Sequence, residues 1–258
     1  MNIVGVIPAR MGSSRFPGKP MANILGIPMI GHVYLRSKMS RLLNEVYVAT
    51  CDQEIFDYVT QIGGKAIMTA DSHERASDRT AEALLHIEKM TGERVDIVVM
   101  IQGDEPMLHP EMIDEAVKPL VADESILVSN LMAPLITPEE HDDINEVKVV
   151  VDQDFFALYF SREPIPSRRR MGDDIPKNKQ VCIIPFQRDF LIKFGELDPT
   201  PLEIIESVDM LRVLEHGYKV KIVPTRFEVY SVDTETDRQR VEALMVDDEL
   251  FPKYYTNR

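Results

Sequence analysis

Apolar runs of strand length alternate with amphipathic runs of helix length over most of this chain. The strand-like runs are rich in β-branched residues and cover 2–8, 45–50, 65–69, 95–102, 126–131, 219–223 and 228–232. The helix-like runs cover 28–39, 52–61, 78–89, 110–120, 188–194, 201–216 and 236–246, with Asp52 as the expected N-cap of the second. Strands that alternate with helices in this way predict an α/β fold with a mostly parallel central sheet flanked by helices.

One part of the chain departs from this alternation. The strand-like runs 145–152 and 156–162 follow each other with no helix between them, which predicts an antiparallel pair. The next segment, 164–179, is rich in Pro, Arg and Asp and is predicted to be a mobile loop. We therefore expect a single domain over 1–258 that carries a small antiparallel lobe, or dimerisation arm, at about 133–187.

Length and charge narrow the classes of function. A chain of 258 residues can bury a large core, and 44% hydrophobic with 28% charged residues is typical of a globular protein. The net charge of −14 argues against a general nucleic-acid binder, and two cysteines are too few for a disulfide framework or a zinc cluster. No signal peptide and no apolar run of about 20 residues is visible, so the sequence predicts a cytoplasmic protein without membrane attachment.

A loop rich in small and basic residues follows the first predicted strand. It holds Gly12, Ser13, Ser14, Gly18, Arg10, Arg15 and Lys19. Small residues let backbone N–H groups approach phosphate oxygens, and the cations supply the charge that a triphosphate requires. Five residues separate Gly12 from Gly18 and Pro20 follows Lys19, so the loop is not a P-loop. A polyphosphate site is predicted here, and a basic surface loop is the alternative.

Two aspartates follow strand-like runs and precede helices. Asp104 comes after the most continuously apolar run of the chain, 95–102, which is typical of a strand covered on both faces. Asp233 comes after 228–232. Carboxylates at such junctions suit Mg²⁺, which takes few protein oxygens and keeps its other positions for phosphates and water. Each aspartate alone could instead cap a helix, but together with the basic loop they favour magnesium-dependent phosphate chemistry.

Several motifs then make a family resemblance visible. In chain order they are Ile7-Pro8-Ala9-Arg10, Ser14-Arg15, Pro17-Gly18-Lys19-Pro20, Gln102-Gly103-Asp104-Glu105-Pro106, Val147-Lys148-Val149-Val150, Ala157-Leu158-Tyr159-Phe160-Ser161-Arg162 and Val232-Asp233-Thr234. They closely resemble the motifs of the CMP-Kdo synthetases, the 3-deoxy-manno-octulosonate cytidylyltransferases, and they span nearly the whole chain in the same order.

The resemblance implies a nucleotide-diphospho-sugar transferase type of fold and a homodimer. It also implies CTP and Mg²⁺ as requirements, and transfer of CMP to the anomeric hydroxyl of an eight-carbon keto acid for lipopolysaccharide synthesis, with release of pyrophosphate. By the same resemblance, Arg10, Arg15 and Lys19 bind the triphosphate, Asp104 and Asp233 bind the metal, His73, Ser77 and Arg79 lie near the base, and Gln102, Arg162, Gln180 and Asp209 bind the sugar acid. Lys19, Asp104 and Asp233 form the expected catalytic set.

The chain departs from the family pattern mainly in the sugar-binding motifs. The usual His and first Tyr of one motif become Gln180 and Ile184, the usual Glu of another becomes Asp209, Tyr230-Ser231 replaces a Gly-Thr-Gly, and Arg75-Ala76-Ser77 replaces a Ser-Gly-Thr. Exchange of a titratable His for a neutral Gln, with acids retained at Glu203, Glu206 and Asp209, favours a cationic substrate group. We therefore expect the sugar to be the 8-amino-3,8-dideoxy relative of Kdo.

Three alternatives remain open on the sequence. The changes are also compatible with drift in an ordinary Kdo enzyme. A sialic-acid cytidylyltransferase shares the chemistry but has different motifs around the first loop and the sugar pocket. A catalytically silent nucleotide-binding regulator is disfavoured because Lys19, Asp104 and Asp233 are all retained.

Overall fold

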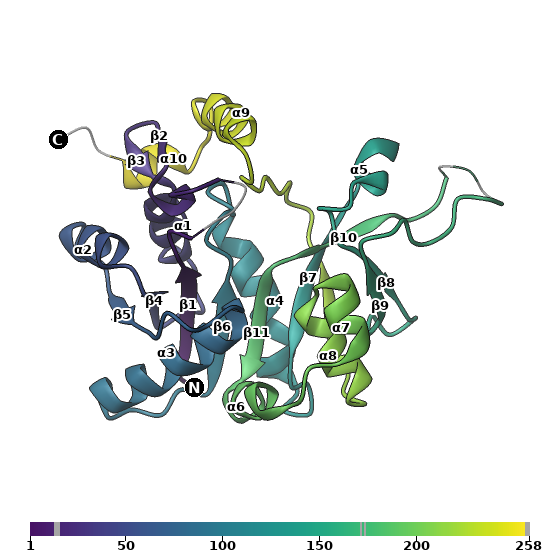
Figure 1. Ribbon diagram of the computed structural model, residues 1–258, viewed down its shortest axis with the longest axis horizontal. Helices are drawn as coiled ribbons and strands as arrows, with labels where there is room; N and C mark the ends of the chain where they lie inside the picture. The colour runs from purple at the N-terminus through teal and green to yellow at the C-terminus, as the bar shows by residue number, and fades with distance from the viewer. Residues whose placement is uncertain (13–15, 171, 173, 256–258) are drawn as a thin grey trace. The chain divides into compact units, whose positions relative to one another are not determined.

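The computed structural model describes residues 1–12, 16–170, 172 and 174–255 (Figure 1). The chain divides into two compact units. The first unit comprises Met1–Asp114 with Val229–Arg258, and the second comprises Glu115–Glu228. Helix α4 (Pro110–Ala122) runs across the boundary in sequence.

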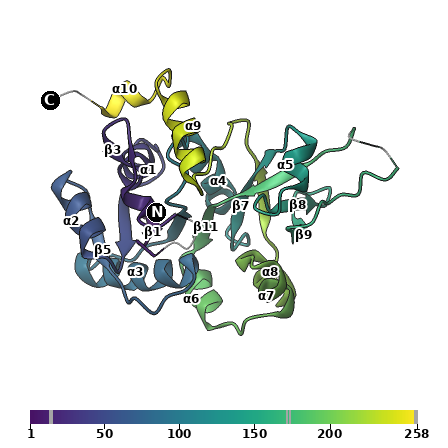
Figure 2. The same cartoon turned by 45° about the horizontal axis from the view of Figure 1, so that its top comes forward.

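The first unit contains a parallel sheet. Its strands are β1 (Ile3–Ala9), β4 (Glu45–Thr50), β5 (Ala66–Met68) and β6 (Ile97–Ile101), in the order β6-β1-β4-β5. All three pairings are parallel, which confirms the predicted alternation. Every residue of β6 is buried, as the apolar run predicted. In the turned view of Figure 2, α3 (Ala76–Thr91) lies across the strands, and it contacts all four.

The remaining elements of this unit come from the part of the chain that follows β1 and from its C-terminal part. They are η1 (Lys19–Met21), β2 (Asn23–Ile24), β3 (Ile27–Pro28), α1 (Met29–Ser37), α2 (Gln53–Gln61), α9 (Glu235–Met245) and α10 (Phe251–Tyr254). Figure 1 shows the yellow helices α9 and α10 beside the purple hairpin of β2 and β3. The last part of the chain therefore returns to elements that directly follow β1.

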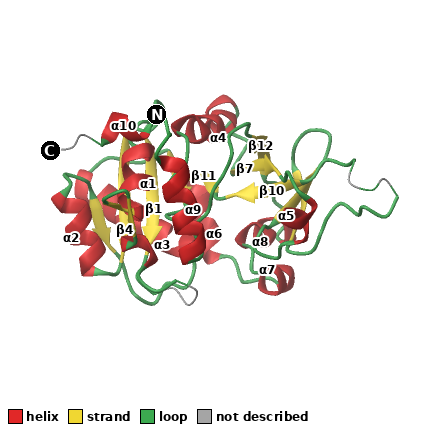
Figure 3. Cartoon of the chain, turned by 90° about the horizontal axis from the view of Figure 1, so that it is seen from above, coloured by secondary structure: helices red, strands yellow, loops and turns green. Residues whose placement is uncertain are grey.

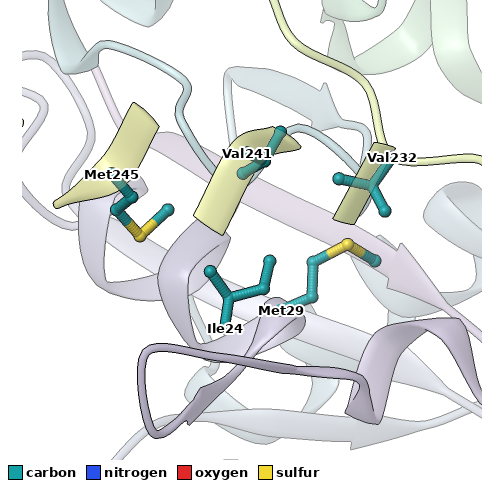
Figure 4. Close-up of a cluster of buried hydrophobic side chains, with 5 residues drawn as sticks. All are labelled: Ile24, Met29, Val232, Val241 and Met245. Carbon is teal, nitrogen blue, oxygen red and sulfur yellow. The ribbon is translucent and has the colours of Figure 1, made fainter. Parts of the chain in front are cut away.

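A buried apolar cluster holds this returning segment in place. Ile24 and Met29 pack against Val232, Val241 and Met245, and all five side chains are buried (Figure 4). Burial of side chains of this size contributes about 1.5–3 kcal/mol each relative to full exposure. Val232 immediately precedes Asp233, and Val241 and Met245 belong to α9, so the cluster holds the chain on both sides of Asp233.

A chain of hydrogen bonds ties α10 to α1. Arg36 Nε lies 3.1 Å from the Tyr254 hydroxyl, which lies 2.8 Å from His32 Nδ1, and His32 Nε2 lies 2.9 Å from the Ile24 carbonyl oxygen. A carbonyl oxygen can only accept, so His32 Nε2 carries the proton and Nδ1 accepts from Tyr254. The directions are therefore Arg36 to Tyr254 to His32 to Ile24. Neutral His32 is the form that completes this chain.

The buried imidazole predicts a dependence of stability on pH. Burial lowers the pKa of His32 to about 4 from 6.5, although its bond to Ile24 opposes this. The unfolded chain protonates His32 near pH 6.5, so this contribution is fully present above that pH and is lost as pH falls toward 4. We expect a loss of about 3 kcal/mol in the free energy of unfolding over this window, measured by urea denaturation at several pH values.

The control for this prediction uses a second histidine of the same unit. His86 is half exposed, so H86Q should keep the slope between pH 6.5 and 4, whereas H32Q should flatten it. Equal slopes in the two variants would show that other groups cause the pH dependence.

The second unit contains a mixed sheet. Its strands are β7 (Ser129–Pro134), β8 (Lys148–Val151), β9 (Ala157–Ser161), β10 (Asn178–Val181) and β12 (Lys221–Pro224), in the order β12-β7-β10-β8-β9. Only β12 and β7 are parallel, and the predicted antiparallel pair is confirmed as β8 and β9. Strand β11 (Ile183–Gln187) lies beside β7, and its Phe186 forms an isolated antiparallel bridge with Val128, the residue before β7. The helices are α5 (Pro138–Asp142), α6 (Arg188–Glu196), α7 (Pro201–Glu206) and α8 (Asp209–Glu215).

Three local predictions were wrong. The helix predicted over 201–216 is broken at Ser207, whose positive φ of 52° ends α7 before α8 begins, and the two helices lie side by side (Figure 3). Residues 228–232 form no strand. The predicted loop over 164–179 ends in strand β10, which the polar residues Asn178, Lys179 and Gln180 concealed. Within the described residues, no helix has both the length and the apolar character needed to cross a membrane.

Candidate active site

The first loop is closed by its own backbone. The Gly18 N–H donates to the Met11 carbonyl at 3.1 Å, and Gly18 has a φ of 73°, a conformation that favours glycine. This turn makes Lys19 the first residue of η1. Arg10 is exposed at the end of β1, whereas Ser13, Ser14 and Arg15 lie outside the described residues. The structure therefore places Lys19 in detail and leaves the triphosphate role of Arg10 and Arg15 a prediction.

Asp52 anchors the same loop. It occupies the N-cap position of α2, as predicted, but its carboxylate makes no capping bond to that helix. Asp52 Oδ2 instead accepts a hydrogen bond of 2.7 Å from the Met11 N–H. The segment after β4 is thus joined to the segment after β1, a contact that no sequence pattern predicted.

Lys19 joins the two predicted metal ligands. Its Nζ lies 2.7 Å from Asp104 Oδ2 and 2.9 Å from Asp233 Oδ1. Only 13% of the side-chain surface of Lys19 and of Asp104 is exposed, so these ion pairs are poorly screened by solvent. Burial alone would lower the pKa of Lys19, but the two carboxylates together raise it. We call Asp104 and Asp233 the carboxylate pair.

Backbone contacts explain how residues so distant in sequence meet. The Val232 N–H donates to the Asp104 carbonyl at 2.9 Å, so the segment before α9 runs beside the segment after β6. Thr234 provides the N-cap of α9 in a capping box with Asp237, and helix α4 begins only at Pro110. Neither member of the carboxylate pair caps a helix. The alternative role considered from the sequence is therefore excluded for both.

The carboxylate pair offers oxygen ligands for a divalent cation. Asp104 Oδ2 accepts from Lys19 and, at 3.1 Å, from Gln102 Nε2. The second oxygen, Asp104 Oδ1, is buried and has no hydrogen-bond partner among the described residues. An orphaned buried carboxylate oxygen is costly unless a ligand or cation completes it. The described residues contain no group of three or more metal-binding side chains, so a cation here would need further ligands from substrate and water.

The residues predicted to lie near the base gather at the start of α3. Ser77 and Arg79 are buried, and His73 pairs with Glu82 of the same helix. Arg79 Nη1 donates to Thr69 Oγ1 and to the Ala70 carbonyl, whereas its Nη2 is buried with no partner in the described part of the chain. The guanidinium is therefore held in place with one nitrogen still able to donate.

The other predicted sugar-binding residues belong to the second unit. Arg162 Nε donates to the Glu206 carbonyl at 2.6 Å, and its Nη1 donates to the Ile144 carbonyl at 2.8 Å. Gln180 lies on β10 and Asp209 begins α8. The backbone carbonyl of Arg162 accepts from buried Lys148, whose ammonium also donates to two other carbonyls. Lys148 thus orders the Arg162 segment, a role that the family motif did not reveal.

One element of the charge argument was wrong. Glu203 was expected to help surround a cationic substrate group, but both its oxygens bind Arg212, at 2.7 Å and 2.6 Å. Both side chains are buried, and the Arg212 guanidinium also lies 4.8 Å from the centre of the Phe194 ring. Because this pair is internally neutral, Glu203 does not add net negative charge to a sugar site.

Gln180 has an unexpected partner in Asn130 of β7. Gln180 Nε2 donates to Asn130 Oδ1 at 2.6 Å, and the Asn130 Nδ2 donates to the Val181 and Leu131 carbonyls at 2.6 Å and 3.1 Å. Asn130 is fully buried. An asparagine inside a predicted apolar strand was the signal that could have identified it, since a buried amide needs partners.

Comparison with known proteins decides the family. The family model described as cytidylyltransferase matches residues 4–222. The chain is 42% identical over 251 residues to a 3-deoxy-manno-octulosonate cytidylyltransferase from Geobacter metallireducens, covering 93% of this chain and 96% of the relative. The chain belongs to the 3-deoxy-manno-octulosonate cytidylyltransferases.

Solved structures agree with this assignment. A CMP:2-keto-3-deoxy-manno-octonic acid synthetase complexed with CTP is similar to this cytidylyltransferase with a TM-score of 0.86 and 37% identity, over 95% of this chain and 99% of the other. A 4-diphosphocytidyl-2C-methyl-D-erythritol synthase from Anaerococcus prevotii has a TM-score of 0.61 at 12% identity, over 95% and 98% of the chains, and shares the fold alone. The predicted fold class and the nucleotidyltransferase activity are thereby confirmed.

The contact between Asp52 and Met11 yields a prediction about nucleotide binding. D52A removes the acceptor that anchors the first loop, so we expect KM for CTP to rise about fivefold to tenfold, the equivalent of about 1–1.4 kcal/mol. The thermal midpoint should change little because no capping bond is lost. Steady-state kinetics and thermal unfolding of the same preparation check both statements. A lower midpoint with unchanged KM would show that Asp52 serves α2 instead.

Proposed function

We propose that this cytidylyltransferase transfers CMP from CTP to the anomeric hydroxyl of a 3-deoxy-octulosonic acid, with a preference for the 8-amino-3,8-dideoxy form. The convergence of Lys19, Asp104 and Asp233 is the observation that carries the proposal. One buried cation and two carboxylates from distant segments suit a reaction whose main demand is to position and neutralise phosphates. No side-chain nucleophile is needed.

The roles of the residues follow from their charges. Asp104 and Asp233 would hold Mg²⁺, and the orphaned Asp104 Oδ1 supports this assignment. Bound Mg²⁺ neutralises phosphate charge during the displacement. Lys19 and exposed Arg10 would bind the triphosphate and stabilise the departing pyrophosphate. Gln102, which already contacts Asp104, would orient the sugar acid next to the same carboxylate.

Arg79 is suited to recognise the base. Its buried Nη2 has no partner within the described chain, and a buried charged donor without an acceptor costs about 1–3 kcal/mol or more. A carbonyl oxygen or ring nitrogen of the nucleobase would satisfy it. Ser77 lies two residues earlier on the same helix and points to a different side of it, so its place near the base stays a prediction.

The hydrogen bonds of Gln180 support the amino-sugar preference. Backbone carbonyls only accept, so the Asn130 amide is oriented with Nδ2 toward them and Oδ1 toward Gln180. Gln180 must then donate its Nε2 to Asn130, and its Oε1 is an acceptor for another group. A hydrogen bond to an ammonium contributes more than one to a neutral hydroxyl, and a histidine at this position could become a repelling cation.

The test compares three sugar acids with CTP and Mg²⁺. We expect kcat/KM for 8-amino-3,8-dideoxy-manno-octulosonate to exceed that for Kdo at least about tenfold, which corresponds to about 1.4 kcal/mol. N-acetylneuraminate should give no product. The measurement is pyrophosphate release. A preference for Kdo would contradict the amino-sugar proposal and support an ordinary Kdo enzyme. Absence of pyrophosphate release with every sugar would support the catalytically silent regulator.

Two glutamines of the second unit provide matched variants. Q180M removes the acceptor at similar side-chain length and should bring the ratio of kcat/KM for the two sugars close to one. Q187M removes a glutamine whose Nε2 donates to the Leu120 carbonyl at 3.1 Å and should leave the ratio unchanged.

We further propose a homodimer formed through the arm at 133–187. This segment exposes Ile136, Ile144 and Leu158, with 71%, 61% and 62% of their surface accessible. Large apolar side chains exposed in one segment are a common feature of subunit interfaces.

Sedimentation velocity tests the dimer. The protein should sediment with twice the protomer mass, and L158E should shift it toward the monomer because a carboxylate would be buried without a partner. L85E, on exposed Leu85 of α3, should leave the dimer intact. A monomeric protein, or dissociation by L85E alone, would contradict the assignment of the arm.

A further inference from the structure

The carboxylate pair already holds a cation of the protein's own. The Lys19 ammonium contacts one oxygen of each aspartate, at 2.7 Å and 2.9 Å, with little exposure to solvent. These are the same side chains to which the proposed function assigns the metal. Two carboxylates that approach one point repel each other unless a positive charge lies between them. Lys19 therefore supplies the charge that allows Asp104 and Asp233 to come together.

A divalent cation and the ammonium compete for these oxygens. An oxygen bound to Mg²⁺ at about 2.0–2.1 Å leaves no room for the ammonium between the carboxylates, and the two cations repel each other. Asp104 Oδ1 is a buried oxygen that neither the ammonium nor another described group contacts. A single carboxylate oxygen is a weak site for a hydrated divalent ion.

CTP changes the competition between the ammonium and the metal, because its phosphates offer the Lys19 ammonium other acceptors. Lys19 follows a closed loop at the end of β1 and begins a helical turn, so its flexible stem can redirect Nζ without moving the backbone. Phosphate oxygens then replace the aspartates as acceptors, and the aspartates become available to the metal. The metal and the nucleotide thereby favour each other's binding.

We propose that Lys19 occupies the place of the divalent cation in the nucleotide-free enzyme, so that the metal binds tightly only when a nucleotide triphosphate draws the ammonium away. This inference rests on the proposed function, because it assumes that Asp104 and Asp233 are the metal ligands. It assigns Lys19 a second role, as an internal counter-ion that keeps the carboxylate pair assembled and closed to free metal.

Binding of Mn²⁺ to the enzyme without nucleotide tests the proposal. Free Mn²⁺ is measured by its electron paramagnetic resonance signal. K19M keeps the length of the side chain but removes the charge, and it should bind Mn²⁺ at least tenfold more tightly than the unsubstituted enzyme. K19R retains a cation and should stay as weak as the unsubstituted enzyme. Equal Mn²⁺ affinity in K19M and the unsubstituted enzyme would overturn the proposal.

Two controls separate this effect from others. K65M removes a lysine of the same unit, whose Nζ lies 3.1 Å from Glu45 Oε1 at the surface, and should leave Mn²⁺ affinity unchanged. An equal increase of Mn²⁺ affinity in K65M would show that the loss of any positive charge has this effect, and it would refute the proposal. The double variant with K19M and D104N should lose the gain, because the metal is then deprived of its ligand.

A second measurement covers the case in which K19M is unstable. Without the ammonium the carboxylates repel, so K19M should melt at a lower temperature, and Mn²⁺ should raise its melting temperature more than that of the unsubstituted enzyme. Failure of Mn²⁺ to stabilise K19M would contradict the competition. The metal site itself is tested separately, since D104N alone should weaken Mn²⁺ binding in the presence of CTP whatever the result for K19M.

Discussion

The meeting of residues 104 and 233 depends on one backbone hydrogen bond and the apolar cluster behind it. The Val232 N–H binds the Asp104 carbonyl, and Val232 itself packs with Ile24, Met29, Val241 and Met245. The chain thus returns to its first unit after leaving it for more than a hundred residues. Everything proposed about metal and phosphate depends on this return, because Asp233 contributes nothing unless it reaches Lys19.

Several polar contacts in the same unit hold its C-terminal segment against the N-terminal elements. The buried chain from Arg36 through Tyr254 and His32 to Ile24 joins the last helix to the first, and the Arg36 guanidinium also pairs with Asp248. Buried polar groups with complete partners make one arrangement strongly preferred over others. Contacts outside the site, between the C-terminal helices and the N-terminal elements, therefore help to fix the positions of Asp104 and Asp233.

In the second unit, charges that serve the scaffold can be told apart from the proposed sugar contact. Its buried Glu203 and Arg212 neutralise each other, and its buried Lys148 is satisfied by three carbonyls, so these charges serve the scaffold. Gln180 differs because Asn130 sets the direction of its amide and thereby the atom that it presents. The proposed role of Gln180 in sugar choice therefore involves different residues from the proposed metal site, because Lys19, Asp104 and Asp233 belong to the other unit.

The hydrophobic pattern of the sequence predicted the parallel strands β1, β4, β5 and β6 and the antiparallel pair β8 and β9. The sequence motifs indicated the family and singled out Asp104 and Asp233 as candidate metal ligands. These features are local or are encoded in short motifs, so they can be read one segment at a time. Tertiary structure alone decided that Asp52 serves the first loop, that Glu203 is neutralised, that Asn130 orients Gln180, and that Lys19 lies between two carboxylates. Each of these contacts joins residues that are 9 to 214 positions apart in the sequence. Such partners meet only because the tertiary packing brings them together, and a local sequence pattern does not predict which residues will meet.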